Sequence, residues 1–182
     1  MRATTPAEAL LAGWLRRLVD LLLAAGGPVA RQLERCVLDK TASLRLDDAW
    51  LQLSACRDAA GELAVEIAAG EGEPARQLAT SGEALRDILE GRALLDAAVA
   101  DGRVDLRAPL AELLAFHELA MLALALGPRS PGLRALWADF DAAWPSGAPR
   151  CVPLAQQAAR HGALVQAVPL EVRLARSPAA NA

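Results

Sequence analysis

A change in the spacing of apolar residues divides this chain and limits the folds that it can adopt. Between Ala7 and Ala25 leucines recur every three or four residues, the period of a helix with one apolar face. Between residues 41 and 67 apolar and polar residues alternate, the period of half-buried strands. The helical period then returns at Thr80. We therefore expect an α+β fold, in which helices cover an antiparallel, twisted sheet of about five strands.

Glycines, prolines and aspartates mark the expected ends of these segments. Gly26-Gly27-Pro28 ends the first helix, Asp47-Asp48 and Asp58 to Gly61 are hairpin turns, and Thr80 with Glu83 has the spacing of a capping box. The expected elements are helices over 7–25 and 29–40, strands over 43–47, 50–54, 63–67 and 75–79, helices over 80–91 and 93–100, a strand over 103–107, and helices over 109–126 and 131–143.

Three parts of the chain follow from this order of elements. Residues 1–40 are expected to form a helical segment that packs on the domain, and 41–145 an α+β domain with C-terminal helices. Residues 146–182 are expected to be a partly disordered extension, helical over 153–161 and extended over 165–174. Residues 41–108 carry seven basic and thirteen acidic side chains. This acidity fits a solvated surface, or alternatively a surface that faces a basic partner.

Composition excludes several classes of protein. A net charge of −3 gives no support for nucleic-acid binding. Cys36, Cys56 and Cys151 stand far apart, so they indicate neither a disulfide framework nor a metal site, and we expect a cytoplasmic protein without a cofactor. The most apolar window, Pro109 to Gly127, carries Glu112, His117 and Glu118. Because lipid would have to bury those side chains, we expect no transmembrane segment, although the first helix could contact a membrane surface.

Two stretches resemble the sterol carrier protein type 2 family over roughly residues 41–108. Residues 80–92 read TSGEALRDILEGR, and residues 97–106 read AAVADGRVDL. In that family a meander precedes a short helix that ends in Gly, then a second short helix, then Gly, a basic residue and a strand. The resemblance implies a twisted sheet backed by helices around an apolar tunnel for lipids or acyl chains, without catalytic residues. The flanking helices also resemble the layout of bacterial accessory proteins of ubiquinone biosynthesis.

Catalytic candidates are few, and each has a structural interpretation. His117 and Glu118 are adjacent in sequence and point about 100° apart on a helix, so they lack the geometry of a paired metal site. No GxSxG signature or similar nucleophile motif occurs, and Asp47-Asp48 is better explained as a turn than as a carboxylate pair. We therefore expect that the protein is not an enzyme.

Apolar surfaces provide the remaining candidates. The leucines of 110–126 surround most of their helix, which predicts burial on nearly all sides, either as a core helix or against a partner or tunnel. Trp137, Phe140 and Trp144 form a ridge on the next helix, in the core or at an interface. We expect a hydrophobic-ligand binding accessory protein for a lipid, acyl or isoprenoid molecule, or alternatively an assembly or adaptor subunit that contacts a protein partner or a second copy. The expected pocket residues are Leu53, Val65, Leu85, Leu89, Leu113, Phe116 and Met121, and the expected interface residues are Trp14, Trp137, Phe140 and Trp144.

Overall fold

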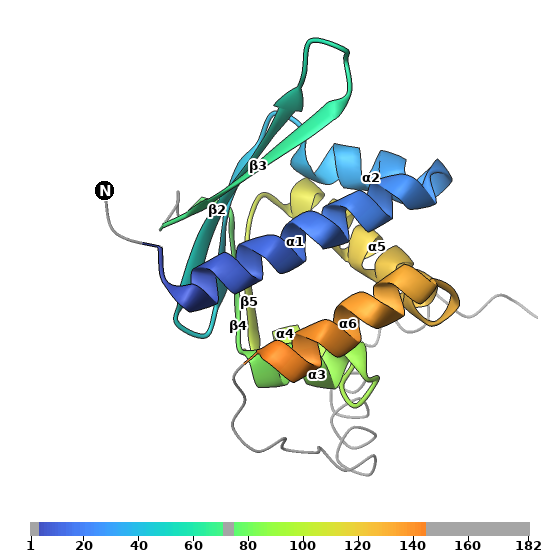
Figure 1. Cartoon of the computed structure of the whole chain (residues 1–182). Coiled ribbons are helices and arrows are strands. Elements are labelled where there is room, and N and C mark those ends of the chain that lie inside the picture. Colours follow the sequence, from blue (N-terminus) through green and yellow to red (C-terminus); the bar gives the residue numbers. More distant parts are fainter. Residues whose placement is uncertain (1–3, 71–74, 145–182) are drawn as a thin grey trace, which may run out of the picture.

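The computed structural model describes residues 4–70 and 75–144, and it confirms the α+β fold class (Figure 1). Two helices precede three strands, and two short helices separate the fourth strand from the fifth. The elements are α1 (Pro6–Ala25), α2 (Gly27–Val37), β1 (Thr41–Leu46), β2 (Ala49–Arg57), β3 (Leu63–Ala69), β4 (Gln77–Thr80), α3 (Gly82–Leu89), α4 (Leu95–Ala100), β5 (Val104–Arg107), α5 (Leu110–Leu126), the 3-10 turn η1 (Gly127–Arg129) and α6 (Pro131–Ala143). The predictions for 153–161, 165–174 and 177–182 lie outside the described residues.

The five strands form one sheet in the order β3-β2-β1-β4-β5. Three pairings are antiparallel as expected, but β1 and β4 pair in parallel, which corrects the prediction of a purely antiparallel sheet. The register places the end of β3 and the start of β4 at the same level of the sheet. Across the four strands β3, β2, β1 and β4, the residues at this level are Ala69, Leu51, Leu44 and Leu78. Residues 70–76 separate β3 from β4 in the sequence, fewer than the dozen or so that a helical crossover between parallel strands usually takes.

One face of the sheet is apolar and is covered by α1. The alternating leucines Leu44, Leu46 and Leu51 point to this face, and α1 crosses β2 and β3 beside them (Figure 1). Helix α6 runs beside α1, and its Leu133 and Leu136 are fully buried in the same cluster. The first strands and the last helix therefore share one core, although they lie far apart in the sequence.

Local capping fixes the start of the helices, with one change from the prediction. Thr5 caps α1 in a full capping box with Glu8. Helix α3 is capped by the Ser81 hydroxyl, which accepts from the Ala84 N–H, whereas Thr80 was the expected cap. The reason is that Thr80 is the last residue of β4, where it pairs with Val104 and its hydroxyl donates to the Arg103 carbonyl.

Helix α5 is less buried than its sequence predicts. It packs on α2, where Gln32 donates to the Ala115 carbonyl, and only Leu119 is buried. Leu110 and Leu114 are 73% and 62% exposed. The prediction of burial on nearly all sides is therefore wrong. The reason is that the apolar residues surround the helix evenly, while α2 covers one side of it.

The segment that carries the family resemblance is held by one buried carboxylate. Asp87 of α3 is fully buried and accepts from Arg92 Nε at 2.9 Å, and it also pairs with Arg103. These two arginines follow Gly91 and Gly102, the glycines that end α3 and the turn after α4. The Gly-Arg pairs of the sequence are thus structural, since they tie α3 to the turns on both sides of α4.

Candidate functional site

A groove between α1 and α6 has an aromatic floor. Trp14 lies 5.2 Å from Phe140, and Phe140 stacks on Trp144 at 5.7 Å between ring centroids. The groove has a volume of about 300 Å³, which is at the lower end for small-molecule sites. At its rim Arg17 pairs with Asp139 at 2.8 Å, with both side chains more than half exposed. Its lining residues are Ala9, Leu10, Gly13, Trp14, Arg17, Asp139, Phe140, Ala143 and Trp144.

Small residues keep this groove open. Ala9 and Gly13 lie on the α1 side and Ala143 on the α6 side, so the two helices present aromatic rings with little beside them. A Cβ built on Gly13 would meet no atom within 4 Å, which shows that this space is empty of protein. Trp14 is held in place by its indole N–H, which donates to the Leu136 carbonyl at 3.0 Å.

Arg86 of α3 supports the floor of the groove from the protein interior. Its guanidinium lies 5.5 Å from the Phe140 ring and donates to Asp141 Oδ1 at 2.6 Å and to the Trp144 carbonyl at 2.8 Å. Arg86 is 5% exposed, and its Nη1 has no hydrogen-bond partner within the described part of the chain. This contact fixes the end of α6 against α3, and nothing in the spacing of the sequence pointed to it.

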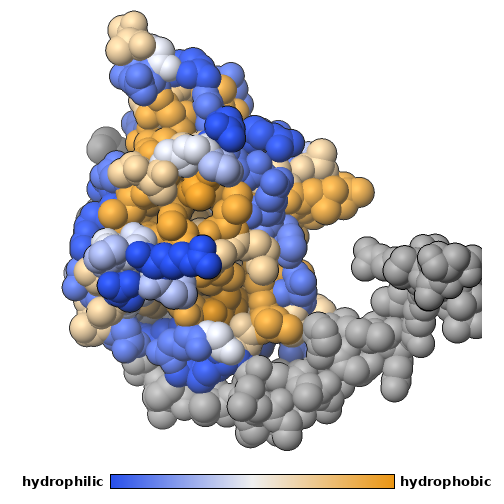
Figure 2. All heavy atoms as spheres, turned by 90° about the vertical axis from the view of Figure 1, so that its right-hand side faces the viewer, coloured by the Kyte–Doolittle hydropathy of each residue, from blue (hydrophilic) through white to orange (hydrophobic). Residues whose placement is uncertain are grey.

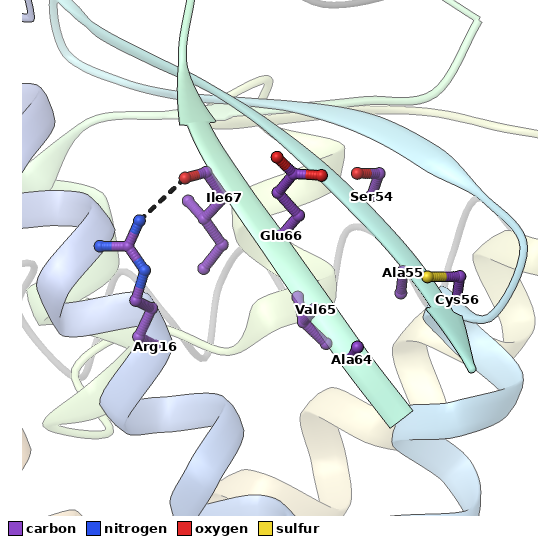
Figure 3. Close-up of a pocket in the computed structure, with 8 residues that line it drawn as sticks. All are labelled: Arg16, Ser54, Ala55, Cys56, Ala64, Val65, Glu66 and Ile67. Atoms are coloured by element: carbon purple, nitrogen blue, oxygen red, sulfur yellow. Dashed lines mark hydrogen bonds between the residues drawn. The ribbon is translucent and has the colours of Figure 1, made fainter. Parts of the chain in front are cut away.

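A second, more polar groove lies along the edge strand β3, where α1 passes over it (Figure 3). Arg16 of α1 donates from Nη2 to the Ile67 carbonyl at 2.9 Å, so it satisfies one backbone group at the open edge of the sheet. The volume is about 470 Å³, and both faces of the hairpin contribute to the lining. The residues around it are Arg16, Ser54, Ala55, Cys56, Ala64, Val65, Glu66 and Ile67.

Figure 2 shows the side of the molecule on which α2, α5 and α6 lie. Hydrophobic residues gather in the middle of this face, and hydrophilic residues follow most of its border. Buried apolar residues of the described ranges form three clusters, one around α1 and α6, one around α3 to β5, and one between α1, α2 and α5. The second and third clusters are small beside the first, as the satellites of one main core usually are.

Among residues 4–70 and 75–144, the surroundings of two titratable groups, Glu112 and Cys36, shift their pKa values. The Arg76 side chain donates two hydrogen bonds to Glu112, at 2.7 and 3.0 Å, and thereby lowers the pKa of that carboxyl. Burial raises the pKa of the Cys36 thiol, against the opposing charges of Lys40 and Arg35. His117 Nε2 contacts Asp96 Oδ1 at 3.0 Å, as an ion pair when the imidazole is protonated.

Within residues 4–70 and 75–144, no three His, Cys, Asp or Glu side chains are placed to hold a metal ion.

Comparison with known proteins gives a likeness at the level of fold. A solved structure titled "UbiJ-SCP2 Ubiquinone synthesis protein" is similar to this chain with a TM-score of 0.45 and 17% identity, over 70% of this chain and 98% of that one. At this similarity the match says nothing about what the present chain binds. No protein-family model and no curated protein sequence matches the chain.

The structure places the expected pocket residues in two groups. Leu53, Val65 and Leu85 are half-buried against the cluster around α1 and α6, while Leu89 is half-buried at the end of α3. On α5, Leu113 and Phe116 are half-buried and Met121 is 48% exposed. Helix α1 packs on β2 and β3, the strands that carry Leu53 and Val65, whereas α5 packs mainly on α2. The expected pocket residues of the sheet and of α5 therefore do not face each other across one pocket.

The expected interface residues lie together. Trp14, Phe140 and Trp144 are all at least 91% buried in the main cluster, and they also form the floor of the α1–α6 groove. Trp137 is half-buried against the same cluster, where its ring packs on Gly127. Sequence reasoning identified the aromatic ridge but missed Gly13 and Ala143, whose small side chains make space beside it. The signal was available, because Gly13 is a glycine inside a helical pattern.

By length and composition, Leu110–Arg129 would also pass as a membrane-spanning helix, a test that core helices of soluble proteins pass as well. In the structure Glu112 of this helix forms an ion pair with Arg76, and His117 Nε2 contacts Asp96 Oδ1 at 3.0 Å. These two contacts hold α5 against β4 and α4, since Arg76 directly precedes β4 and Asp96 lies in α4.

Proposed function

We propose that this protein is a non-catalytic accessory protein of the cytoplasm that binds a hydrophobic molecule such as a lipid, an acyl chain or an isoprenoid. The observation that carries the proposal is the α1–α6 groove, with the rings of Trp14, Phe140 and Trp144 as its floor. Aromatic rings beside an empty, apolar space favour a ligand that is itself apolar.

The polar groups around the groove support binding rather than chemistry. Arg17 and Asp139 form an ion pair with each other at the rim. Arg86, on the interior side of the floor, donates hydrogen bonds to Asp141 and to the Trp144 carbonyl. General acid–base or nucleophilic catalysis would require a titratable group aimed at the bound molecule. The lining of this groove offers only the Arg17–Asp139 pair, so we assign the site a binding role.

A groove-filling substitution tests the proposal. A Cβ built on Gly13 meets no described atom within 4 Å beyond its own stretch of helix, so Gly13→Leu adds its side chain to the groove and not to the packed core. Ala24→Leu is the matched control, because Ala24 is an exposed residue of the same helix outside the groove. We expect the full chain to bind a fluorescent polyene fatty acid, and Gly13→Leu to weaken binding at least about tenfold while Ala24→Leu leaves it unchanged.

Mass spectrometry of the purified chain provides an independent measurement. Lipid extracted from the wild type and reduced in Gly13→Leu would support the proposal. The proposal is wrong if no lipid is extracted and the fluorescent fatty acid does not bind, or if both variants bind it as the wild type does.

A role as an assembly or adaptor subunit is the second candidate function, and one observation favours it. Leu94, Leu110, Leu114 and Met121 are between 48% and 73% exposed on and beside α4 and α5. Exposed apolar residues that gather on one part of a surface often mark a protein–protein contact. This role predicts a stable complex by native mass spectrometry that does not depend on Gly13, so the Gly13→Leu variant separates the two functions.

A further inference from the structure

The exposed large apolar side chains of the described ranges are concentrated on one surface. Leu94, Val99, Leu110, Leu114 and Met121 belong to α4, α5 or the residue before α4, and Leu10 of α1 is the sixth. The 3.0 Å contact between Asp96 Oδ1 and His117 Nε2 shows that α4 and α5, which carry or adjoin the first five residues, are neighbours. We call these five residues the α4–α5 surface.

On α5 the exposed residues follow the helix in a single stripe. At 100° per residue they occupy an arc of about 120°, opposite the buried Leu119. Residues 110, 114, 117, 121 and 125 of this stripe follow one another at steps of four, three, four and four, the spacing at which side chains of one helix face can meet a second helix. The exposed residues of α5 are Leu110, Ala111, Leu114, His117, Glu118, Met121 and Ala125.

We propose that the α4–α5 surface binds a second copy of this chain, with the two α5 helices antiparallel about a twofold axis that passes between His117 and Glu118. This inference goes beyond the proposed ligand binding and involves other residues. A twofold axis at that position pairs residues that lie equally far from it in the sequence. Leu114 then meets Met121 of the other copy, Leu110 meets Ala125, and His117 meets Glu118.

These pairings are complementary in size and in chemistry. The axis places a large side chain, Leu110, against a small one, Ala125, at both ends of the stripe, and two flexible apolar side chains meet near its centre. At the axis a base faces an acid, so Glu118 of one copy does not directly oppose Glu118 of the other. A parallel pair would set Glu118 of one copy against Glu118 of the other, a like-charge contact that the antiparallel pair avoids.

The charges of the surface favour a second copy over a membrane. A helix that lies in a bilayer interface typically has lysines and arginines beside its apolar face, which attract anionic lipids. The exposed titratable residues of α4 and α5 are Asp96, His117 and Glu118, and two of these are acidic. Anionic headgroups would be repelled by this surface.

A charge-pair experiment tests both the pairing and its direction. Leu114→Glu and Met121→Lys each place a charge in the centre of the stripe, at positions that are 62% and 48% exposed and so are tolerated by the fold. We expect each variant alone to weaken self-association at least tenfold in sedimentation velocity of the full chain. An equimolar mixture should recover dimers, because the antiparallel register sets the introduced carboxylate of one variant opposite the introduced ammonium group of the other. Ala142→Arg, at an exposed alanine of α6 that does not line the α1–α6 groove, should dimerise as the wild type does.

Several outcomes would overturn the proposal. A wild-type chain that stays monomeric up to about 200 µM has no such interface, since even small specific interfaces associate in this range. Dimers that persist in both single variants, or a mixture that recovers none, would exclude the antiparallel α5 contact. Flotation of the wild type with vesicles that contain anionic lipid, lost in Leu114→Glu, would assign the surface to a membrane instead. Binding of the fluorescent fatty acid by the Leu114→Glu variant tests the groove separately, so failure of one proposal does not imply failure of the other.

Discussion

The indole N–H of Trp144 donates a 2.9 Å hydrogen bond to Asp47 Oδ2, across 97 residues of sequence. The same carboxylate oxygen accepts from the Gly82 N–H at 3.1 Å, and the Asp47 N–H donates to the Thr80 carbonyl. Asp47 therefore joins the β1–β2 turn, the start of α3 and the end of α6. Its left-handed backbone, with φ of 50°, is one that Asp and Asn adopt more readily than other residues with a Cβ.

Replacing Asp47 tests this junction. We expect Asp47→Ala to destabilise the fold by about 1–3 kcal/mol, because the buried Trp144 N–H and the Gly82 N–H lose their acceptor. Asp47→Asn keeps one carbonyl oxygen and the backbone preference, so it should lose less. Urea unfolding at neutral pH measures both, and equal losses in the two variants would contradict the role of the oxygen.

Two glycines should respond to alanine in opposite directions. A Cβ on Gly82 would lie 2.5 Å from Trp144 Cδ1, so Gly82→Ala must displace the indole and cost about 1–3 kcal/mol. Gly13 lies within α1 and a Cβ there meets nothing, so Gly13→Ala should stabilise the chain by about 0.5–1 kcal/mol through helix propensity. Thermal unfolding of the two variants beside the wild type gives the sign of each change, and a shift in the same direction for both would contradict this reading of the packing.

Buried and exposed carboxylates should differ in their contribution to stability. Asp87→Asn removes the charge that Arg92 and Arg103 share in the interior, which we expect to cost about 3–5 kcal/mol. Asp139→Asn removes the partner of Arg17 at the surface, where both side chains are more than half exposed, and should cost less than about 1 kcal/mol. Denaturant midpoints compare the two. A loss in Asp87→Asn no larger than in Asp139→Asn would show that the buried pairs do not hold α3 to its neighbours.

Acid should weaken the attachment of α5 at its first turn. The Arg76 hydrogen bonds lower the pKa of Glu112 below its ordinary value of 4.5, so the folded chain binds this proton more weakly than the unfolded chain does. The stabilisation is thus fully present above pH 4.5 and is lost as the pH falls through the lowered pKa. In Glu112→Gln this contribution is absent at every pH. The difference in unfolding free energy between wild type and variant should shrink between pH of about 6 and about 3. A constant difference would show that Glu112 has no lowered pKa.

Much of the secondary structure could be predicted because its signals are local. The alternation of Leu44, Leu46 and Leu51 with polar residues gave the strands, and the turn at Asp47-Asp48 gave their hairpin. The parallel pairing of β1 with β4 could not be predicted in this way. Alternation tells which face of a strand is apolar, but it carries no information about which strand lies beside it.

In the candidate site, too, local sequence signals predicted side chains on one helix but not the helix that packs beside them. The spacing of Trp137, Phe140 and Trp144 predicted an aromatic ridge, but not that α1 would lie along it with Gly13 facing the rings. Arg86 gave no signal either, because an arginine on a short helix usually points to solvent. Its burial depends on the end of α6, which approaches α3 only in the folded chain.

The sequence by itself determined where helices and strands form and which faces of them are apolar, since both depend on neighbours within a few turns or strand residues. Only the tertiary structure decided which apolar faces are covered. Helix α1 rather than α5 covers β2 and β3, and α5, apolar on every side, keeps Leu110 and Leu114 exposed. The physical reason is that hydrophobic burial is non-directional: a sequence specifies how much apolar surface a helix offers, and the packing of the whole chain selects the side that is covered.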